Sequence, residues 1–197
     1  MEGTAIARTQ KGADEGRYKL LFVDESAFYL LPGVVRTWAP CGQTPVLHSL
    51  LSRDHLSVIS AVSPEGDLFL EVRETAFDSA GIIGFLENLL AQVEGNIVLV
   101  WDGAPIHRSK LVKGYLAEGA TCRLHLERLP GYAPELNPDE GIWQYLKHVE
   151  MKNLCCPDMT HLKSQLDRAV SRLRTKPHII QACFKQVGYF SNLPRGQ

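Results

Sequence analysis

The feature that most constrains the fold is an apolar run that ends abruptly in an aspartate. Residues Asn96 to Trp101 are apolar after the first, rich in β-branched side chains, and bounded by Gly95 and Gly103. Such a run is typical of a strand that is buried on both faces of a sheet. Asp102 therefore follows directly on a buried strand. A carboxylate there is costly unless it is paired, or unless it faces a cleft and binds something cationic.

A second constraint is the proline-rich loop from Leu129 to Pro138, which leads into a helix. Asn137 suits the N-cap of this helix, and Pro138 suits its first position. Asp139 and Glu140 then fall in the first turn, where the helix dipole favours acidic side chains. These two acids are open to two interpretations, routine helix-start chemistry or delivery of a carboxylate to a site.

A third acid favours a site. Leu20 to Val23 is another apolar strand, and we predict that it ends at Asp24. A helix predicted from apolar spacing between Ile82 and Val93, capped by Asp78, separates the two acid-terminated strands, so that they can lie parallel as a crossover unit. Adjacent strands lie about 4.8 Å apart, so Asp24 and Asp102 are expected to project from one edge of the sheet.

The remaining patterns predict an α/β fold with a mixed sheet. His55 to Val62 and Asp67 to Arg73 are predicted to form a hairpin, and Ser26 to Gly33 a turn followed by an extended piece at Val34 to Ala39. We further predict a strand at residues 122–129 and helices at 107–116, 138–151, 158–173 and 179–187. Strands alternating with helices in this order indicate helices packed on a sheet.

Composition indicates one globular domain of 197 residues, 45% of them hydrophobic. No run reaches the roughly 18 apolar residues of a membrane helix, and residues 1–17 lack the apolar centre of a signal peptide. We therefore expect a soluble cytoplasmic protein whose residues 1–17 form a disordered extension. The 5 cysteines include no C-x-x-C pair, which argues against a disulfide framework or a zinc ribbon.

Charge is unevenly distributed, although the formal net charge is only −1. The segment after residue 150 holds the acids Asp158 and Asp167 and the basic residues Lys152, Lys163, Arg168, Arg172, Arg174, Lys176, Lys185 and Arg195. An acidic centre beside a basic segment suits a metal site flanked by a surface for a polyanion. A solvated helix face accounts for the same charges equally well.

Converging carboxylates repel one another unless a divalent cation lies between them, and oxygen-only ligands favour Mg²⁺ or Mn²⁺. Two such ions about 4 Å apart can activate a water or hydroxyl and stabilise the leaving oxygen of a phosphodiester. The sequence has no Gly-rich phosphate loop, no G-x-S-x-G and no H-E-x-x-H. Nucleotide-triphosphate, esterase and zinc-protease chemistry therefore have no support.

Three segments, Val23 to Ser26, Val100 to His107 and Gly131 to Trp143, resemble the catalytic domain of DDE-type insertion-sequence transposases related to the mariner superfamily. The resemblance covers about Tyr18 to Leu146, and its last segment is the most specific. It departs from the family pattern at Ala133, where a serine is usual, and at Asp139, where an apolar residue is usual. The resemblance implies a ribonuclease-H-like, retroviral-integrase-like fold with a mixed five-stranded sheet and helices on both faces.

The resemblance also implies the chemistry. Asp24, Asp102 and Glu140 would be the catalytic triad and would hold two Mg²⁺ (or Mn²⁺) ions, with Glu135 as the rival third ligand. The expected activity is metal-dependent phosphodiester hydrolysis at the ends of a mobile element, followed by strand transfer into target DNA. Candidate DNA contacts are His107, Arg108, Lys110 and Lys147.

The expected partners are element ends and target DNA, with a homodimer in the DNA complex. Relatives carry helix-turn-helix modules ahead of the catalytic domain, and we expect such a module to be missing or separate here. We divide the chain into a catalytic domain at residues 18–150 and basic C-terminal helices at 151–197 that pack on it or extend it. Two alternatives are a non-catalytic DNA-binding or assembly remnant and a nuclease that cuts without joining.

Overall fold

The fold is built on one mixed sheet, seen in a computed structural model that describes residues 17–48, 52–118, 122–130 and 134–189. The sheet has 5 strands in the order β3-β2-β1-β4-β5. Their bounds are β1 Lys19–Tyr29, β2 His55–Val62, β3 Leu68–Arg73, β4 Ile97–Trp101 and β5 Leu124–Arg128. β1, β2 and β3 pair antiparallel, whereas β1, β4 and β5 pair parallel. This confirms the predicted mixed five-stranded sheet.

The central strand β1 is longer than predicted. It runs through Asp24 to Tyr29, where the sequence predicted a turn from Ser26. The reason is non-local, because the second half of β1 pairs with β2, from Glu25 opposite Ile59 to Tyr29 opposite His55. Asp24 therefore lies in the middle of a strand and not at its end.

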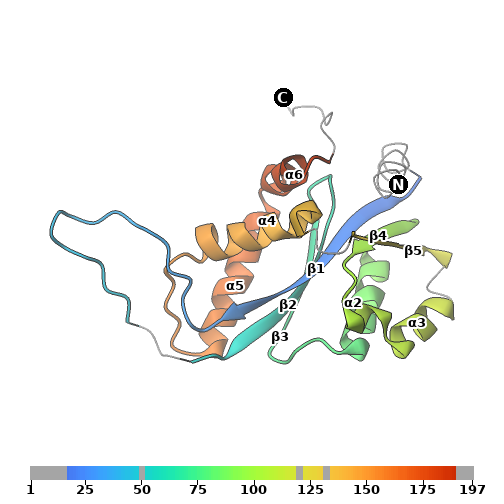
Figure 1. The fold of residues 1–197 in the computed structure, drawn as a ribbon, viewed down its shortest axis with the longest axis horizontal. Helices are drawn as coiled ribbons and strands as arrows, with labels where there is room; N and C mark the ends of the chain where they lie inside the picture. The colour runs from blue at the N-terminus through green and yellow to red at the C-terminus, as the bar shows by residue number, and fades with distance from the viewer. Residues whose placement is uncertain (1–16, 49–51, 119–121, 131–133, 190–197) are drawn as a thin grey trace.

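Helices cover both faces of the sheet (Figure 1). One face carries α2 (Ser79–Gln92) and α3 (Lys110–Ala117), and the other carries α4 (Pro138–Tyr145), α5 (Met159–Arg174) and α6 (Pro177–Gln186). Side chains alternate along β1, so that Leu21 and Val23 lie in the core with α2, whereas Leu20 and Phe22 lie in the core with α4, α5 and α6. By the same alternation, Asp24 faces the α4 side.

Three short irregular helical segments flank the regular ones. They are the 3₁₀ segments η1 (Pro105–Arg108) and η3 (Pro134–Leu136) and the π-helical turn η4 (Leu146–Glu150). The helix predicted at 107–116 is thus split, because Ser109 caps a new helix by accepting from the N–H of Val112 at 3.3 Å. No helix in the described part of the chain has the length and apolar character needed to cross a membrane.

Helix α6 supports α4 through a close approach at Gly141. A Cβ on Gly141 would lie 2.8 Å from the Sγ of Cys183 on α6, which is closer than real Cβ atoms come to other atoms. Only glycine allows the two helices to pack at this separation. The helix that carries Glu140 therefore rests on the last helix of the chain.

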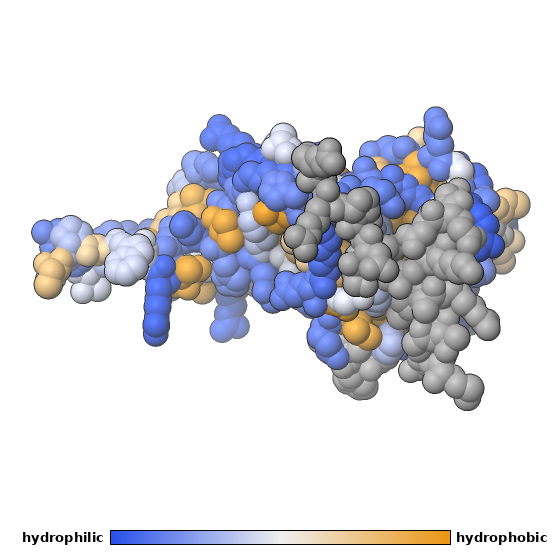
Figure 2. All heavy atoms as spheres, turned by 90° about the horizontal axis from the view of Figure 1, so that it is seen from above, coloured by the Kyte–Doolittle hydropathy of each residue, from blue (hydrophilic) through white to orange (hydrophobic). Residues whose placement is uncertain are grey.

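Residues 31–48 form an arm that projects from the body (Figure 1, the long loop after β1). The predicted extended piece at 34–39 lies in this arm and pairs with no described strand. Figure 2 shows the arm standing clear of the molecule with apolar residues on its surface. Trp38 is 100% exposed and Val34 77%. Asn153 anchors the base of the arm, because its Oδ1 accepts from the N–H of Val35 at 2.7 Å.

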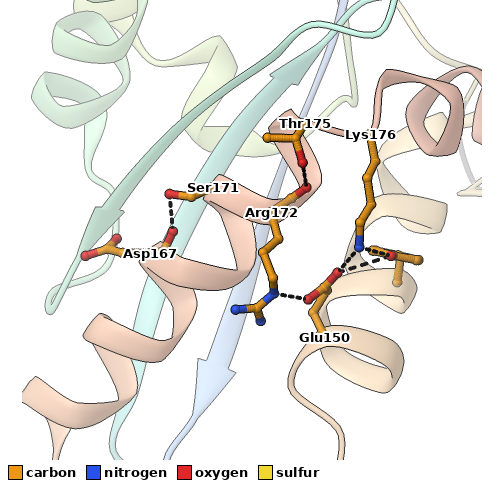
Figure 3. A network of polar contacts seen from close by, with 7 residues as sticks. Glu150, Asp167, Ser171, Arg172, Thr175 and Lys176 are labelled. Atoms are coloured by element: carbon orange, nitrogen blue, oxygen red, sulfur yellow. Dashed lines mark hydrogen bonds and ion pairs between the residues drawn. The ribbon is translucent and has the colours of Figure 1, made fainter.

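A polar network ties η4 to α5 and to the start of α6 (Figure 3). Glu150 accepts from Arg172 Nε at 2.6 Å, from Lys176 Nζ at 2.9 Å and from the Tyr145 hydroxyl at 3.1 Å. The Glu150 side chain is only 7% exposed. Together its three donors hold the pKa of Glu150 below its ordinary value, although burial by itself would raise it.

Replacing Glu150 by glutamine should lower the melting temperature by about 2–4 °C at pH 7, because Arg172 and Lys176 lose their charged partner. The pKa of Glu150 is lowered in the folded protein. Its negative charge therefore stabilises the fold fully at pH values above the ordinary pKa of 4.5, and this stabilisation is lost as the pH falls through the lower pKa of the folded state. Thermal melts of Glu150→Gln and wild type at pH 7 and pH 3 measure both effects. Asp167→Asn is the control, since this acid on α5 is exposed. Equal melting of all three proteins at pH 7 would contradict the prediction.

Candidate active site

Two aspartates occupy matching positions on neighbouring parallel strands. Val23 on β1 pairs with Trp101, the last residue of β4. Asp24 follows Val23 and Asp102 follows Trp101, so the two aspartates stand at corresponding positions. Val98 and Val100 lie in the core on the α4 side, and by alternation Asp102 follows them onto that side. The predicted juxtaposition of the two acids is therefore present, although β1 does not end there.

Glu140 reaches the same place from the first turn of α4, which packs against β1 and β2. Burial raises the pKa of Asp24 to about 7, and the negative charges of Glu140 and Asp102 add to this shift. The hydrogen bond from Trp143 opposes it. The charges of Glu140 and Asp102 thus both act on Asp24, although the three acids come from separate parts of the chain. Glu135 lies exposed in η3, and its charge is not among the causes of the Asp24 shift.

Trp143 is a site residue that the sequence did not predict. Its indole Nε1 donates to Oδ2 of Asp24 at 2.8 Å, and its side chain is buried. Trp143 lies three residues after Glu140, so the two side chains share one side of α4. That spacing is the signal that could have identified it. The hydrogen bond fixes the orientation of the Asp24 carboxylate.

Asp102 is held from its own loop and from His107. Its Oδ1 accepts from the N–H of Ala104 at 2.9 Å, and the Nδ1 of His107 lies 2.9 Å from the same oxygen. The other imidazole nitrogen, Nε2, lies 2.8 Å from Oε1 of Glu25. Burial alone would lower the pKa of His107, but the carboxylates of Glu25 and Asp102 outweigh it and raise the pKa. The His107 side chain is 2% exposed, which leaves little surface for the predicted DNA contact.

Asp139 is not a routine helix-start acid. It is fully buried, and burial raises its pKa well above the ordinary value. The charge of Asp24 adds to this rise, while the hydroxyl of Ser60 donates to its Oδ1 at 2.5 Å. The surroundings of this carboxyl group therefore favour its neutral form.

Lys147 is a basic residue on which the charges of Glu140 and Asp24 act. It is half-buried, and its Nζ donates to the Ser26 hydroxyl at 2.8 Å and lies 5.2 Å from the centroid of the Phe28 ring. Burial lowers the pKa of Lys147, whereas the charges of Glu140 and Asp24 act in the opposite direction. This predicted DNA-binding residue therefore lies at the acid cluster itself. Arg108 and Lys110 follow Asp102 in the sequence and lie exposed at the end of η1 and the start of α3.

Arg128 is a second site residue that the sequence did not predict. It ends β5 and pairs in register with Trp101, which precedes Asp102. A Cβ on Gly103 would clash with a terminal nitrogen of Arg128, so the guanidinium rests directly on that glycine. The Arg128 side chain is exposed and makes no hydrogen bond or ion pair with the described residues. The guanidinium thus lies against the residue that follows Asp102.

The donor set fits a divalent cation. All three acids offer oxygen, and the pKa of Asp24 is raised by burial and by negative charge that a cation would neutralise. Among the described residues, no three Asp, Glu, His or Cys side chains already gather closely enough to form a ready-made metal cluster. Binding would therefore require the carboxylates to draw together.

The sequence model of the DDE superfamily endonuclease family matches residues 19–163. No curated protein matches the chain. Among solved structures, a pre-cleavage Mos1 transpososome is similar with a TM-score of 0.63 and 15% identity, over 93% of this chain and 60% of that chain. The Mos1 strand transfer complex gives 0.61 and 16%, over 95% and 60%. The catalytic domain of Mos1 mariner transposase gives 0.55 and 14%, over 94% and 90%.

These similarities confirm the predicted ribonuclease-H-like fold, which the catalytic domain of Mos1 mariner transposase shares. The chain spans about 60% of the length of the Mos1 chains in the DNA complexes and 90% of the isolated catalytic domain. At 14–16% sequence identity, the similarity to these structures shows a shared fold.

Proposed function

Because the chain belongs to the DDE superfamily of endonucleases, we propose that it is the catalytic domain of a DNA transposase. It would hydrolyse phosphodiesters at the ends of a mobile element and transfer the freed strand to target DNA. The observation that carries this proposal is that Asp24, Asp102 and Glu140 lie on the same side of the sheet, where burial, together with the charges of Glu140 and Asp102, raises the pKa of Asp24. Carboxylates whose charges repel one another in this way are suited to bind divalent cations.

In this proposal Asp24 and Asp102 hold two Mg²⁺ or Mn²⁺ ions, and Glu140 completes the second site. Bound ions would activate the attacking oxygen and stabilise the leaving one. The chain's own residues orient the ligands: Trp143 fixes Asp24, and the N–H of Ala104 fixes Asp102. Mos1 paired-end complexes solved with Mn and with Mg support the choice of cation.

DNA would approach the exposed side of the acids. Arg108 and Lys110 are exposed near Asp102 in sequence, and Arg128 presents an exposed guanidinium against Gly103. We assign phosphate contacts to these three, and a contact at the scissile phosphate to Lys147, whose charge lies within reach of Asp24 and Glu140. His107 would act on the site through its two carboxylate neighbours.

Arg128→Ala is expected to weaken binding of a short DNA duplex and to reduce the slope of log Kd against log salt by about 1, the effect of losing one phosphate contact. Fluorescence anisotropy between low and moderate salt measures it. Arg168→Ala is the control, because Arg168 is exposed on α5, away from the strand ends. A salt slope that both variants leave unchanged would remove Arg128 from the interface.

The proposal extends to a homodimer in the DNA complex. The projecting arm supports the dimer, because a fully exposed Trp38 with Val34 and Val46 exposed nearby is costly in a lone molecule. The similar Mos1 structures include a strand transfer complex and a paired-end complex with the left transposon end, which supports DNA as the partner.

The deciding experiment is cleavage and strand transfer on a labelled duplex in Mg²⁺ or Mn²⁺, with Asp102→Asn as the matched inactive variant. Metal-dependent product from the wild type alone would support the nuclease site, and joined product would support a transferase. Cut product without joined product would favour a nuclease. Absence of both product and Mn²⁺ binding would overturn the catalytic proposal and favour a DNA-binding remnant.

A further inference from the structure

An imidazole lies between two carboxylates at the edge of the proposed site. His107, from η1, stacks on Trp101 with ring centroids 4.2 Å apart and an interplanar angle of 3°. Its Nε2 lies 2.8 Å from Glu25 on β1, and its Nδ1 lies 2.9 Å from Asp102 just after β4. The ring thus links β1 to the residue that follows β4.

The contact to Asp102 is incomplete. Nδ1 of His107 is buried and makes no aligned hydrogen bond with the described residues, although the Asp102 oxygen is within ion-pair distance. A buried polar atom without a partner costs free energy, so a fully satisfied arrangement is favoured. A small rotation of the Asp102 carboxylate would complete the bond. Asp102 can rotate because its side chain is 52% exposed.

We propose that His107 is a positioning residue that fixes the direction of the Asp102 carboxylate for divalent-cation binding. This inference rests on the proposed function. Glu25 and Trp101 hold the ring from two sides, and the ring then presents Nδ1 to Asp102. Without it, Asp102 keeps only the hydrogen bond from the N–H of Ala104 in its own turn. Partners of this kind set the geometry of a ligand, and their loss costs about 10–100-fold in metal affinity.

Two carboxamide substitutions separate the two contacts of the ring. In His107→Asn the amide nitrogen takes the place of Nδ1 and can donate to Asp102, whereas in His107→Gln it reaches toward the place of Nε2 and Glu25. Both variants lose the stacking on Trp101. They are therefore matched for packing and differ in the contact that the proposal requires.

The test is Mn²⁺ affinity measured by EPR titration, together with thermal melts of the metal-free proteins. We expect His107→Gln to weaken Mn²⁺ binding about 10-fold or more, and His107→Asn to remain within about 3-fold of the wild type. Glu25→Gln should weaken binding in the wild type and add little in the His107→Gln background, because the two residues act as one unit.

Equal Mn²⁺ affinity in the wild type and both His107 variants would overturn the positioning role and leave the proposed function intact. Equal losses in the Asn and Gln variants, matched by equal losses in melting temperature, would also overturn it and indicate a packing role. A wild type that binds no Mn²⁺, like Asp102→Asn, would overturn the proposed function and this inference with it.

Discussion

Asp24→Asn is expected to abolish metal-dependent cleavage and yet to stabilise the metal-free protein. Burial and the neighbouring acids raise the pKa of Asp24 from 3.8 to about 7, so the folded state disfavours its charge. In the unfolded chain Asp24 ionises near its ordinary pKa. Asparagine keeps an oxygen that can accept from Trp143 and removes the charge.

The sign follows from proton linkage. Between the two pKa values the folded protein binds more protons than the unfolded chain, so its stability falls as the pH rises from about 4 to about 7 and is level above that range. Asp24→Asn cannot ionise at this position and therefore does not lose stability in this way. We expect it to melt roughly 4–8 °C higher than the wild type at pH 8, a gain of about 2 kcal/mol, and to show a smaller difference at pH 5.

Melting curves of metal-free protein across this pH range measure the effect, and Asp102→Asn is the matched control. Asp102 has an exposed fraction of 52%, so the same chemical change there should bring no comparable gain. Mn²⁺ should raise the melting temperature of the wild type and leave that of Asp24→Asn unchanged. If Asp24→Asn were less stable than the wild type at pH 8, the charge of Asp24 would not destabilise the folded protein.

Glu140→Gln is expected to lose cleavage activity by more than about 100-fold, which exceeds the usual cost of losing a supporting partner of a ligand. Glu135→Gln should remain within roughly threefold of the wild type, as for an exposed residue away from the chemistry. The reason is that the charge of Glu140 acts on Asp24, Asp139 and Lys147, whereas Glu135 is exposed in η3. Single-turnover cleavage in Mn²⁺ compares the two.

A second measurement does not depend on metal. Glu140→Gln removes a charge that raises the pKa of Asp24, so the pH at which stability levels off should move downward. Glu135→Gln should leave that pH unchanged. If instead Glu135→Gln abolished cleavage and Glu140→Gln retained it, the assignment of the third ligand would be reversed.

Features of the fold that depend on local pattern were predictable. β4 and α2 follow from an apolar run and from apolar spacing after the Asp78 cap, and their bounds differ from the prediction by only a few residues. The Asn137 cap that starts α4 was also correct, since its Oδ1 accepts from the N–H of Asp139 at 3.2 Å. These features depend on side chains that are close in sequence.

The features that could not be predicted from the sequence depend on contacts between residues that are far apart in the chain. β1 continues past Asp24 because β2 pairs with Glu25 to Tyr29, although the local sequence there resembles a turn. Asp139 is buried by Ser60, 79 positions away, and therefore cannot act as an exposed first-turn acid. The bond between Glu25 and His107 spans 82 positions. None of these pairings leaves a periodic pattern in a single chain.

The close packing of α6 on α4 at Gly141 also has a consequence for the time at which the site can form during protein synthesis. Chains fold from the N-terminus as they emerge from the ribosome. The sheet with Asp24 and Asp102 can assemble early, but α4 is missing one of its supports until Cys183 has been made. A nascent chain therefore carries two aspartates without a firmly seated Glu140. The complete acid set therefore becomes firmly seated only after α6 has been synthesised and has packed on α4.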